Sequence, residues 1–116
     1  MVTAGPNIFW NGGRLPQMFI DDNDRANIFW VEFRGAGEIY TQKFMPTGTE
    51  VLTSLGLEIY DLGGGTDISY FSVAQNSDDS YTYGWRETIG STDYVKINRL
   101  TDNATVVLGT ELTVTP

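Results

Sequence analysis

Apolar and β-branched residues occur along the chain in short runs that alternate with polar positions, and no window has the 3.6-residue period of an amphipathic helix. Glycine, asparagine, aspartate and proline separate these runs. The pattern predicts an all-β chain. The expected strands are Asn7–Trp10, Leu15–Ile20, Asn27–Phe33, Glu38–Phe44, Thr49–Tyr60, Thr66–Ala74, Tyr81–Glu87, Asp93–Leu100 and Thr105–Val114, the fifth being interrupted near Gly56.

The segments between the predicted strands are short and contain residues suited to turns. Asn11–Arg14 (NGGR) and Arg34–Gly37 (RGAG) supply residues that tolerate a positive φ, and Met45–Gly48 (MPTG) places proline where its fixed φ fits a turn. Short connections favour the pairing of sequential strands. We therefore expect antiparallel meanders.

An internal repeat divides the strands into two groups. Trp30 aligns with Trp85 and Glu32 with Glu87 at an offset of 55 residues, and one extra residue in the later hairpin shifts the offset to 56. Upstream, an offset of 54 sets two acidic turns opposite each other. The other aligned positions are Asp22 and Asn76, Asp24 and Asp78, Ile39 and Val95, Lys43 and Arg99, and Thr49–Leu52 and Thr105–Leu108.

Each copy reads as a strand entering an acidic turn, a strand centred on tryptophan, a glycine-bearing turn, and a strand that ends in a basic and an apolar residue. It resembles a β-propeller blade of the loose form ID-x-N-x-x-x-x-x-x-W-x-E-x-R-x-G-x-x-EIY-x-Q-x-F, most clearly over Met18–Thr49 and less so over Val73–Thr105. The resemblance implies one all-β domain over residues 1–116, with four-stranded blades at about 7–60 and 61–116.

Two blades alone would leave both outer faces bare, because blades cover one another only in a closed ring. We therefore expect the chain to be its own partner in a cyclic homo-oligomer, with a trimer of six blades favoured. The alternative is a monomeric β-sandwich or open barrel in which the repeat has no such meaning.

The composition removes several classes of function. The chain has no cysteine and no histidine, which excludes Ser-His and Cys-His nucleophile systems, disulfides and the usual soft metal sites. Its net charge of −8 repels nucleic acid. No apolar run is long enough to span a membrane, and no signal peptide is evident, so the compartment is left open. No cofactor is expected.

The segment Asp61–Thr66, within EIYDLGGGTDIS, resembles the phosphate-binding DLGGGT turn of actin-like ATPases. A chain of 116 residues cannot hold the two lobes and second turn of such a site. We therefore interpret the glycines as a wide turn between the two repeats.

Acidic turns suggest a second kind of site, because clustered carboxylate and amide oxygens bind calcium. The candidates are Asp22, Asp24, Asp78 and Asp79. Their spacing is not that of an EF-hand, and Asp and Asn also favour turns for reasons of their own. The sequence thus favours turn chemistry and no metal.

Aromatic residues divide into two predicted roles. Trp30 and Trp85, at strand centres, are expected to fill the core of each repeat. Near the glycine-rich segments, an aromatic platform with hydrogen-bonding neighbours suits a sugar. The candidate ligand-binding residues are Trp10, Asn11, Arg14, Tyr60 and Asp61.

Glu32 and Glu87 form a formal pair of carboxylates, as in glycosidases. Residues at equivalent repeat positions are expected to share one environment, whereas the acid and the nucleophile of a glycosidase need two different environments. The sequence therefore favours ion pairs for Glu32 and Glu87 and does not favour an enzyme.

Two functions remain. The first is a carbohydrate-binding, lectin-like ring, which small two-blade propeller lectins resemble in plan. The second is a structural protein of a virus particle, such as a decoration or tail component.

Overall fold

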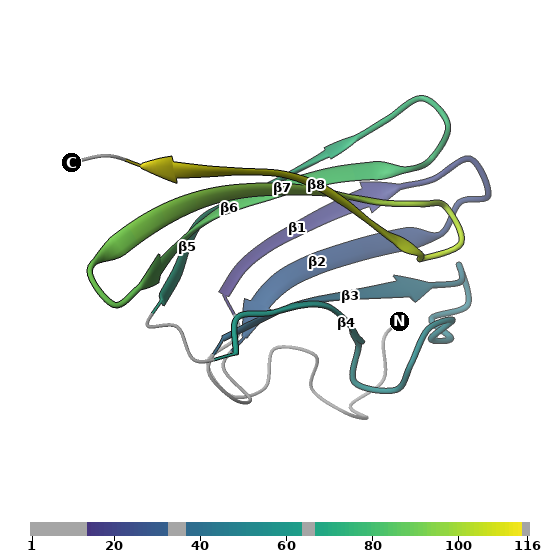
Figure 1. The fold of residues 1–116 in the computed structure, drawn as a ribbon. Coiled ribbons are helices and arrows are strands. Elements are labelled where there is room, and N and C mark those ends of the chain that lie inside the picture. The colour runs from purple at the N-terminus through teal and green to yellow at the C-terminus, as the bar shows by residue number, and fades with distance from the viewer. Residues whose placement is uncertain (1–13, 33–36, 64–66, 115–116) are drawn as a thin grey trace.

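The computed structural model describes residues 14–32, 37–63 and 67–114, and in these residues the chain is all β, as predicted (Figure 1). The predicted strand Asn7–Trp10 lies outside the described residues. Eight strands are present: β1 (Arg14–Ile20), β2 (Ala26–Glu32), β3 (Glu38–Phe44), β4 (Leu57–Asp61), β5 (Asp67–Gln75), β6 (Tyr81–Ile89), β7 (Thr92–Leu100) and β8 (Val106–Val114).

The strands form two four-stranded antiparallel sheets with the orders β1-β2-β3-β4 and β5-β6-β7-β8. Every neighbouring pair is sequential, so the expectation of antiparallel meanders is confirmed. Figure 1 shows the sheets as two layers, with the second above the first. We call the face that each sheet turns toward the other its inner face, and the opposite one its outer face.

The two sheets share their strand registers. Ala26 pairs with Phe44 between β2 and β3, and the equivalent pair between β6 and β7 is Tyr81 with Leu100. A bulge interrupts β1 between Arg14 and Gln17, and another interrupts β5 between Ser69 and Ser72. These positions match at the predicted offsets of 55 and 56 residues, so the backbone pairing of the first three strands is equivalent in the two sheets.

The predicted upstream offset of 54 is wrong. In the turn after β1, the Asp24 amide donates to the Asp21 carbonyl, and in the turn after β5 the Asp79 amide donates to the Asn76 carbonyl. Asp24 and Asp79 take the left-handed position of these turns, with φ of 58° and 60°. The hydrogen bonds and left-handed residues of the two turns therefore align at an offset of 55 residues, and the alignment of the repeats requires no gap here. The offset of 54 came from matching the acidic side chains alone.

The repeats differ in their last strand. In the first sheet, Glu50 forms an isolated bridge with Phe44, the chain then leaves the sheet over Val51–Gly56, and β4 begins at Leu57. The predicted strand Thr49–Tyr60 is therefore wrong before Leu57: the break lies near Gly56 as predicted, but the residues before it form no strand beyond this bridge. In the second sheet β8 runs without such an excursion.

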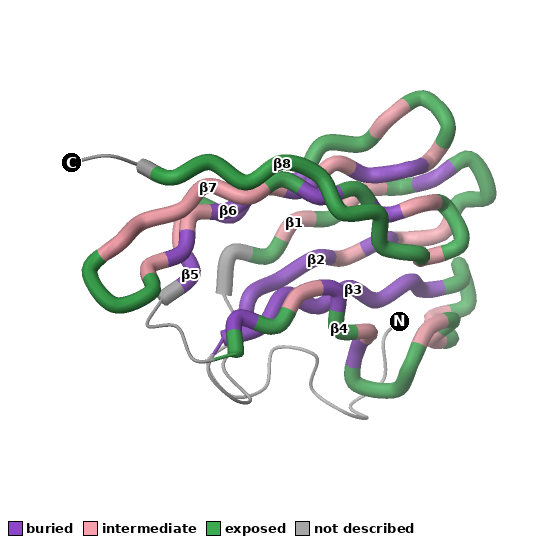
Figure 2. Tube along the Cα trace, viewed as in Figure 1, coloured by how far each residue is buried: buried purple, intermediate pink, exposed green. Residues whose placement is uncertain are grey.

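The main core lies between the inner faces. Phe29, Val31 and Ile39 of the first sheet pack with Tyr81, Tyr83 and Trp85 of the second, and all are nearly or fully buried. The alternation of buried and half-buried residues along β6 follows the period of two expected for a strand. Figure 2 shows burial concentrated in β2 and β3, whereas β8 is exposed along its length.

Trp30 occupies the outer face of the first sheet, where it packs with Tyr40 and Phe44 in a separate cluster. Trp85 lies instead on the inner face of the second sheet. Each indole nevertheless donates to the glutamate two residues later: Trp30 Nε1 lies 2.7 Å from Glu32 Oε1, and Trp85 Nε1 lies 2.9 Å from Glu87 Oε1. Both tryptophans are buried, at 0% and 2% exposure.

The two sheets approach each other most closely along β1 and β5. Gln17 accepts from the Val73 amide at 2.9 Å and donates to the Phe71 carbonyl at 3.0 Å. Gln75 donates in turn to the Ile20 carbonyl. A glutamine side chain thus substitutes for a backbone ladder between the first strands of the two repeats, and the fourth strands lie at the far edges.

Gly56 makes a testable contribution to this fold. A Cβ placed there would lie 2.8 Å from the Trp30 ring, and the residue has a φ of 107°. We expect Gly56→Ala to lower the free energy of unfolding by about 2–4 kcal/mol, combining overpacking with backbone strain. Gly90→Ala is the matched control, because its φ is 63° but its Cβ would meet no atom within 4 Å. Urea titration giving equal losses for both variants would contradict the Trp30 contact.

Candidate ligand-binding cleft

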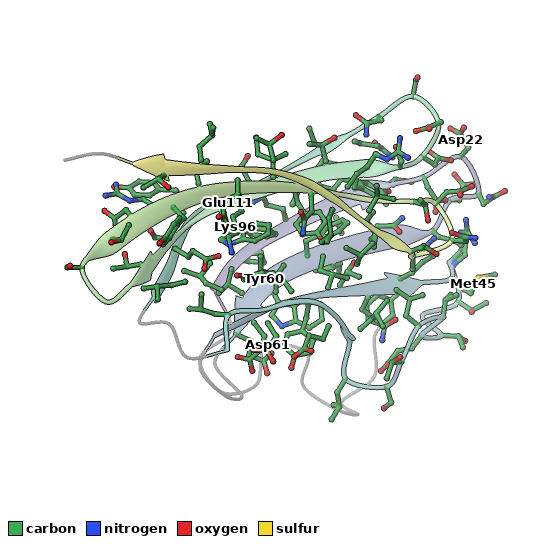
Figure 3. The ribbon with its side chains drawn as sticks, viewed as in Figure 1. Asp22, Met45, Tyr60, Asp61, Lys96 and Glu111 are labelled. Atoms are coloured by element: carbon green, nitrogen blue, oxygen red, sulfur yellow. The ribbon has the colours of Figure 1, made fainter. Side chains whose placement is uncertain are left out.

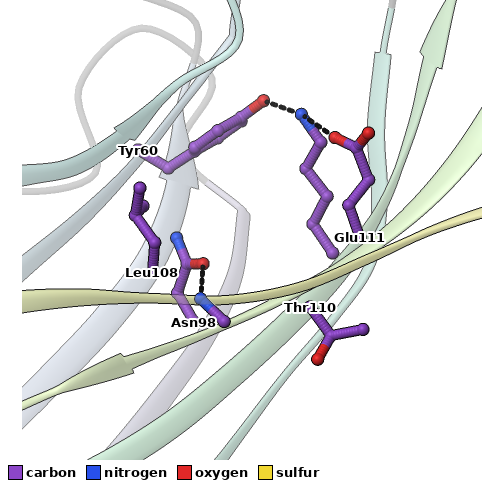
Figure 4. A pocket seen from close by; sticks show the side chains of 7 residues that line it. Tyr60, Asn98, Leu108, Thr110 and Glu111 are labelled. Atoms are coloured by element: carbon purple, nitrogen blue, oxygen red, sulfur yellow. Dashed lines mark hydrogen bonds and ion pairs between the residues drawn. The ribbon is translucent and has the colours of Figure 1, made fainter.

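A cleft of about 210 Å³ opens between β4 of the first sheet and β7 and β8 of the second (Figure 4). It lies on the side of the molecule away from the β1–β5 contact. The residues that line it are Tyr60, Lys96, Asn98, Leu108, Gly109, Thr110 and Glu111. The cleft therefore combines an aromatic ring, an aliphatic side chain, an ammonium group, an amide and a carboxylate.

A β-bulge in β4 directs Tyr60 into the cleft. Ile39 pairs with Tyr60 and Tyr40 with Glu58, which leaves Ile59 as the extra residue. The bulge lets Ile59 and Tyr60 both face the second sheet: Ile59 is buried in the main core, and the Tyr60 ring packs on Trp85 with centroids 4.4 Å apart. Figure 3 shows Tyr60 and Lys96 reaching toward each other from the two sheets.

A second bulge, in β8, shapes the opposite wall. Ile97 pairs with Thr110 and Arg99 with Val107, so Leu108 and Gly109 together face Asn98. The Gly109 amide donates to Asn98 Oδ1 at 3.1 Å, which satisfies a backbone group that the bulge removes from the ladder. A Cβ on Gly109 would lie 2.1 Å from the Ile97 carbonyl oxygen, so this approach of the two strands requires glycine.

A network of charged side chains closes the cleft from behind. Glu87 is fully buried, and its Oε1 accepts from Tyr60 Oη at 2.6 Å and from Trp85 Nε1 at 2.9 Å. Lys96 Nζ lies 3.5 Å from the same oxygen, 3.2 Å from Tyr60 Oη and 3.0 Å from Glu111 Oε2. Among the described residues, Glu87 Oε2 is the buried side-chain oxygen that has no hydrogen-bond partner.

The network changes the ionisation of its members. Burial and the hydrogen bond to Glu87 raise the pKa of Tyr60 to about 12. Burial alone would lower the pKa of Lys96, but its hydrogen bonds to Glu111 and Tyr60 outweigh this effect and raise it above its usual range. At neutral pH the cleft therefore presents a neutral phenol and a positively charged lysine.

The structure separates the residues predicted as a ligand site. Tyr60 lines the cleft, whereas Asp61 is exposed at the end of β4 and accepts from the Gly63 amide at 2.9 Å. Arg14 begins β1, where its backbone pairs with Val31. Trp10 and Asn11 lie outside the described residues. Sequence reasoning missed Lys96, Asn98 and Glu111. Their alternation in β7 and β8 indicates that they share one face of the second sheet, but it does not indicate that Tyr60 of the first sheet lies opposite.

The acidic turns use their carboxylates locally. Asp21 accepts from the Asn23 and Arg25 amides and from Asn27 Nδ2. Of the calcium candidates, Asp78 accepts from the amide and hydroxyl of Ser80, and Asp79 accepts from the Asp22 amide at 3.2 Å. Asp24 supplies the left-handed turn position. In the part of the chain that the structure describes, no group of three or more acidic residues is arranged to hold a metal ion.

The DLGGGT segment begins as a turn leaving the first sheet. Leu62 is buried in the main core and its amide donates to the Gly37 carbonyl, while Gly63 has a φ of 80°. The next three residues, 64–66, are not described. Among the residues that the structure describes, no helix is long and apolar enough to cross a membrane.

The raised Tyr60 pKa gives a pH prediction. The pKa is about 12 in the folded chain against about 10 in an unfolded one. The unfolded chain therefore loses this proton first, and stability falls as the pH rises from 10 to 12. Tyr60→Phe should lose about 1–3 kcal/mol at neutral pH, because Glu87 loses a donor, but should show a smaller further loss above pH 10. Urea titrations at pH 7, 10 and 11.5 measure the free energy of unfolding of both proteins. An equal fall of this free energy with pH in the wild type and in Tyr60→Phe would refute the prediction.

In comparisons with known proteins, no family model, curated protein or solved structure matches the chain.

Proposed function

We propose that the protein is a non-catalytic carbohydrate-binding module whose two sheets are propeller-like blades, and that copies of the chain assemble into a closed ring, with three chains favoured. The cleft beside Tyr60 is the observation that carries the binding role. It takes small ligands from solvent at the place where the two sheets separate, and its lining matches the chemistry of a sugar.

A sugar offers hydroxyl groups that both donate and accept, together with apolar C–H surfaces. In the cleft, Glu111 accepts, Lys96 donates and the Asn98 amide is suited to both. Leu108 and the Tyr60 ring provide apolar contact. Pockets of this kind bind through a few polar groups on a largely apolar lining, and a volume of about 210 Å³ suits a single sugar unit better than a large ligand.

The cleft is also organised before a ligand arrives. Figure 4 shows the chain of contacts that runs from Tyr60 through Lys96 to Glu111. Because Tyr60 is also held by Glu87, the long side chains that would contact a ligand are already restricted. Ordering rotamer-rich side chains costs about 0.5–1.5 kcal/mol each on binding, and this network reduces that cost.

The blade interpretation is supported by the arrangement of the sheets. Each repeat is one four-stranded meander, the two pack face to face, and their first strands lie together while their fourth strands lie apart. A propeller places the first strand of each blade beside the central axis in this way. The outer faces of the two sheets then supply the contacts that would close the ring.

A non-catalytic role is supported by the positions of the two candidate carboxylates. A glycosidase acts with two carboxyl groups about 5–9.5 Å apart on either side of one bond. Glu32 lies on the outer face of the first sheet and Glu87 between the sheets, so the first sheet separates them. Each is held by the indole of its own repeat.

A structural role in a virus particle is the second candidate, favoured by β8. This edge strand exposes Leu108 and Leu112 at 82% and 58%. Exposed apolar residues on an unpaired strand edge mark contact with another protein. Such a role needs assembly but no sugar, and a glycan screen distinguishes it from the first.

We expect the protein to bind at least one carbohydrate on a broad glycan array. Glu111→Gln should then weaken binding about tenfold, because a hydrogen bond to a charged group contributes about 1.5–3 kcal/mol. Glu58→Gln is the matched control, since Glu58 is exposed on β4 but pairs opposite Tyr40 on the outer face. Silence across the array, or equal binding by both variants, would remove the carbohydrate proposal and leave the virion role.

A further inference from the structure

We infer that a second copy of the chain docks head to tail, with the outer face of its first sheet on the outer face of the second sheet of its neighbour. This inference rests on the proposed ring and specifies the surfaces that meet. The first-sheet surface comprises Met18, Ile20, Ala26, Ile28, Phe44 and Met45. The second-sheet surface comprises residues that pair with one another across the four strands and face away from the first sheet, namely Ala74, Thr82, Gly84, Ile97, Arg99 and Val107.

The repeat makes these surfaces equivalent to the pair already in contact inside the chain. At offsets of 55 and 56 residues, Ala26, Ile28 and Phe44 correspond to Tyr81, Tyr83 and Leu100. Those three residues belong to the main core, where they face the first sheet. In the same way Gly84 corresponds to Phe29, which faces them. Applying the operation that relates the first sheet to the second once more therefore brings the two outer surfaces together.

The two surfaces also differ in the size of their side chains. Inside the chain, Phe19 and Phe29 of the first sheet pack against Tyr81 of the second. Their counterparts on the second-sheet surface are the small residues Ala74 and Gly84, and Gly84 lies in a shallow depression of that surface beside Ile97. On the first-sheet surface, the counterparts of Val73 and Gln75 are the larger residues Met18 and Ile20.

Both surfaces expose apolar side chains to solvent in the single chain. Met18 and Ile20 are 63% and 53% exposed, and Ile97 and Val107 are each 40% exposed. Gly56 already covers the Trp30 ring at the centre of the first sheet. The contact between chains therefore lies at the β1–β2 hairpin end of that sheet. Apolar residues gathered on two opposite faces of a small acidic protein mark interaction surfaces.

The charged residues of the two surfaces correspond to charged residues inside the chain in the same way. Lys43 donates to the Asp102 carbonyl of the opposite sheet at 2.9 Å and is attracted by Asp79. Its counterpart is Arg99, which is exposed on the second-sheet surface. The counterparts of Asp102 and Asp79 are Pro46 and Asp24, both of which line the first-sheet surface. The docked arrangement gives Arg99 a carbonyl and a carboxylate equivalent to those of Lys43.

The contact is heterologous, because each chain uses one surface for each neighbour. Such contacts propagate around a ring when the rotation closes, and the rotation between adjacent sheets of a propeller does close. An isologous dimer would instead place like surfaces together, with two methionine-rich faces or two depressions in contact. The differences in size and charge between the surfaces oppose that pairing.

Three matched substitutions test the inference by native mass spectrometry. Met18→Glu and Ile97→Glu each place a charge on one docking surface, and Ile89→Glu places the same charge at the β6–β7 hairpin, outside both surfaces and the cleft, at a residue as exposed as Ile97. We expect the wild type and Ile89→Glu to form the same closed oligomer. Met18→Glu and Ile97→Glu should each weaken assembly about a hundredfold or more, since burying an unpaired charge costs several kcal/mol.

Mixing the two surface variants in equal amounts gives the decisive result. Each retains one intact surface, so the mixture should form a heterodimer and nothing larger. This outcome also shows that both variants are folded. A monomeric wild type, assembly of either variant at the wild-type level, or a mixture that stays monomeric would overturn the interface. Glycan binding by a monomeric wild type would reject the interface while retaining the carbohydrate site.

Discussion

The packing of the two inner faces is the interaction on which the rest of the structure depends. Neither four-stranded sheet could bury a core by itself, and a chain of 116 residues has no disulfide to compensate. Phe29 and Tyr81, whose ring centroids lie 4.9 Å apart, hold the sheets together near the turns, and Gln17 fixes their separation along β1 and β5. Once that edge is fixed, the fourth strands are left apart, and the cleft occupies the resulting space.

A buried carboxylate at the edge of this core determines the character of the cleft. Glu87 is costly to bury, and the phenol of Tyr60, the indole of Trp85 and the ammonium of Lys96 together offset that cost. The same three partners restrain the aromatic and charged groups that face solvent. Stability and the geometry of the cleft therefore depend on one network, which links the aromatic core to the surface of the cleft.

Local pattern predicted much of the fold and little of the site. The strands could be placed because alternation and turn residues are local signals, and Glu38–Phe44 was predicted with the bounds that the structure has. The offset of the acidic turns was wrong because side-chain type is a weaker guide to a turn than the left-handed position held by Asp24 and Asp79. The cleft could not be predicted, because Tyr60 and Lys96 meet across two sheets and their contact depends on bulges that leave no clear mark in the sequence.

The excursion at Val51–Gly56 has a consequence for the two repeats as a pair. Two sheets with matching registers in their first three strands risk exchange within one chain, in which one sheet folds in the place of the other. Only the first unit carries a cap over its tryptophan, since Gly56 closes on Trp30, whereas the Trp85 ring is covered by Tyr60 from the other sheet. The cap makes the duplicated halves distinguishable, so the chain has a unique direction along any assembly of its copies.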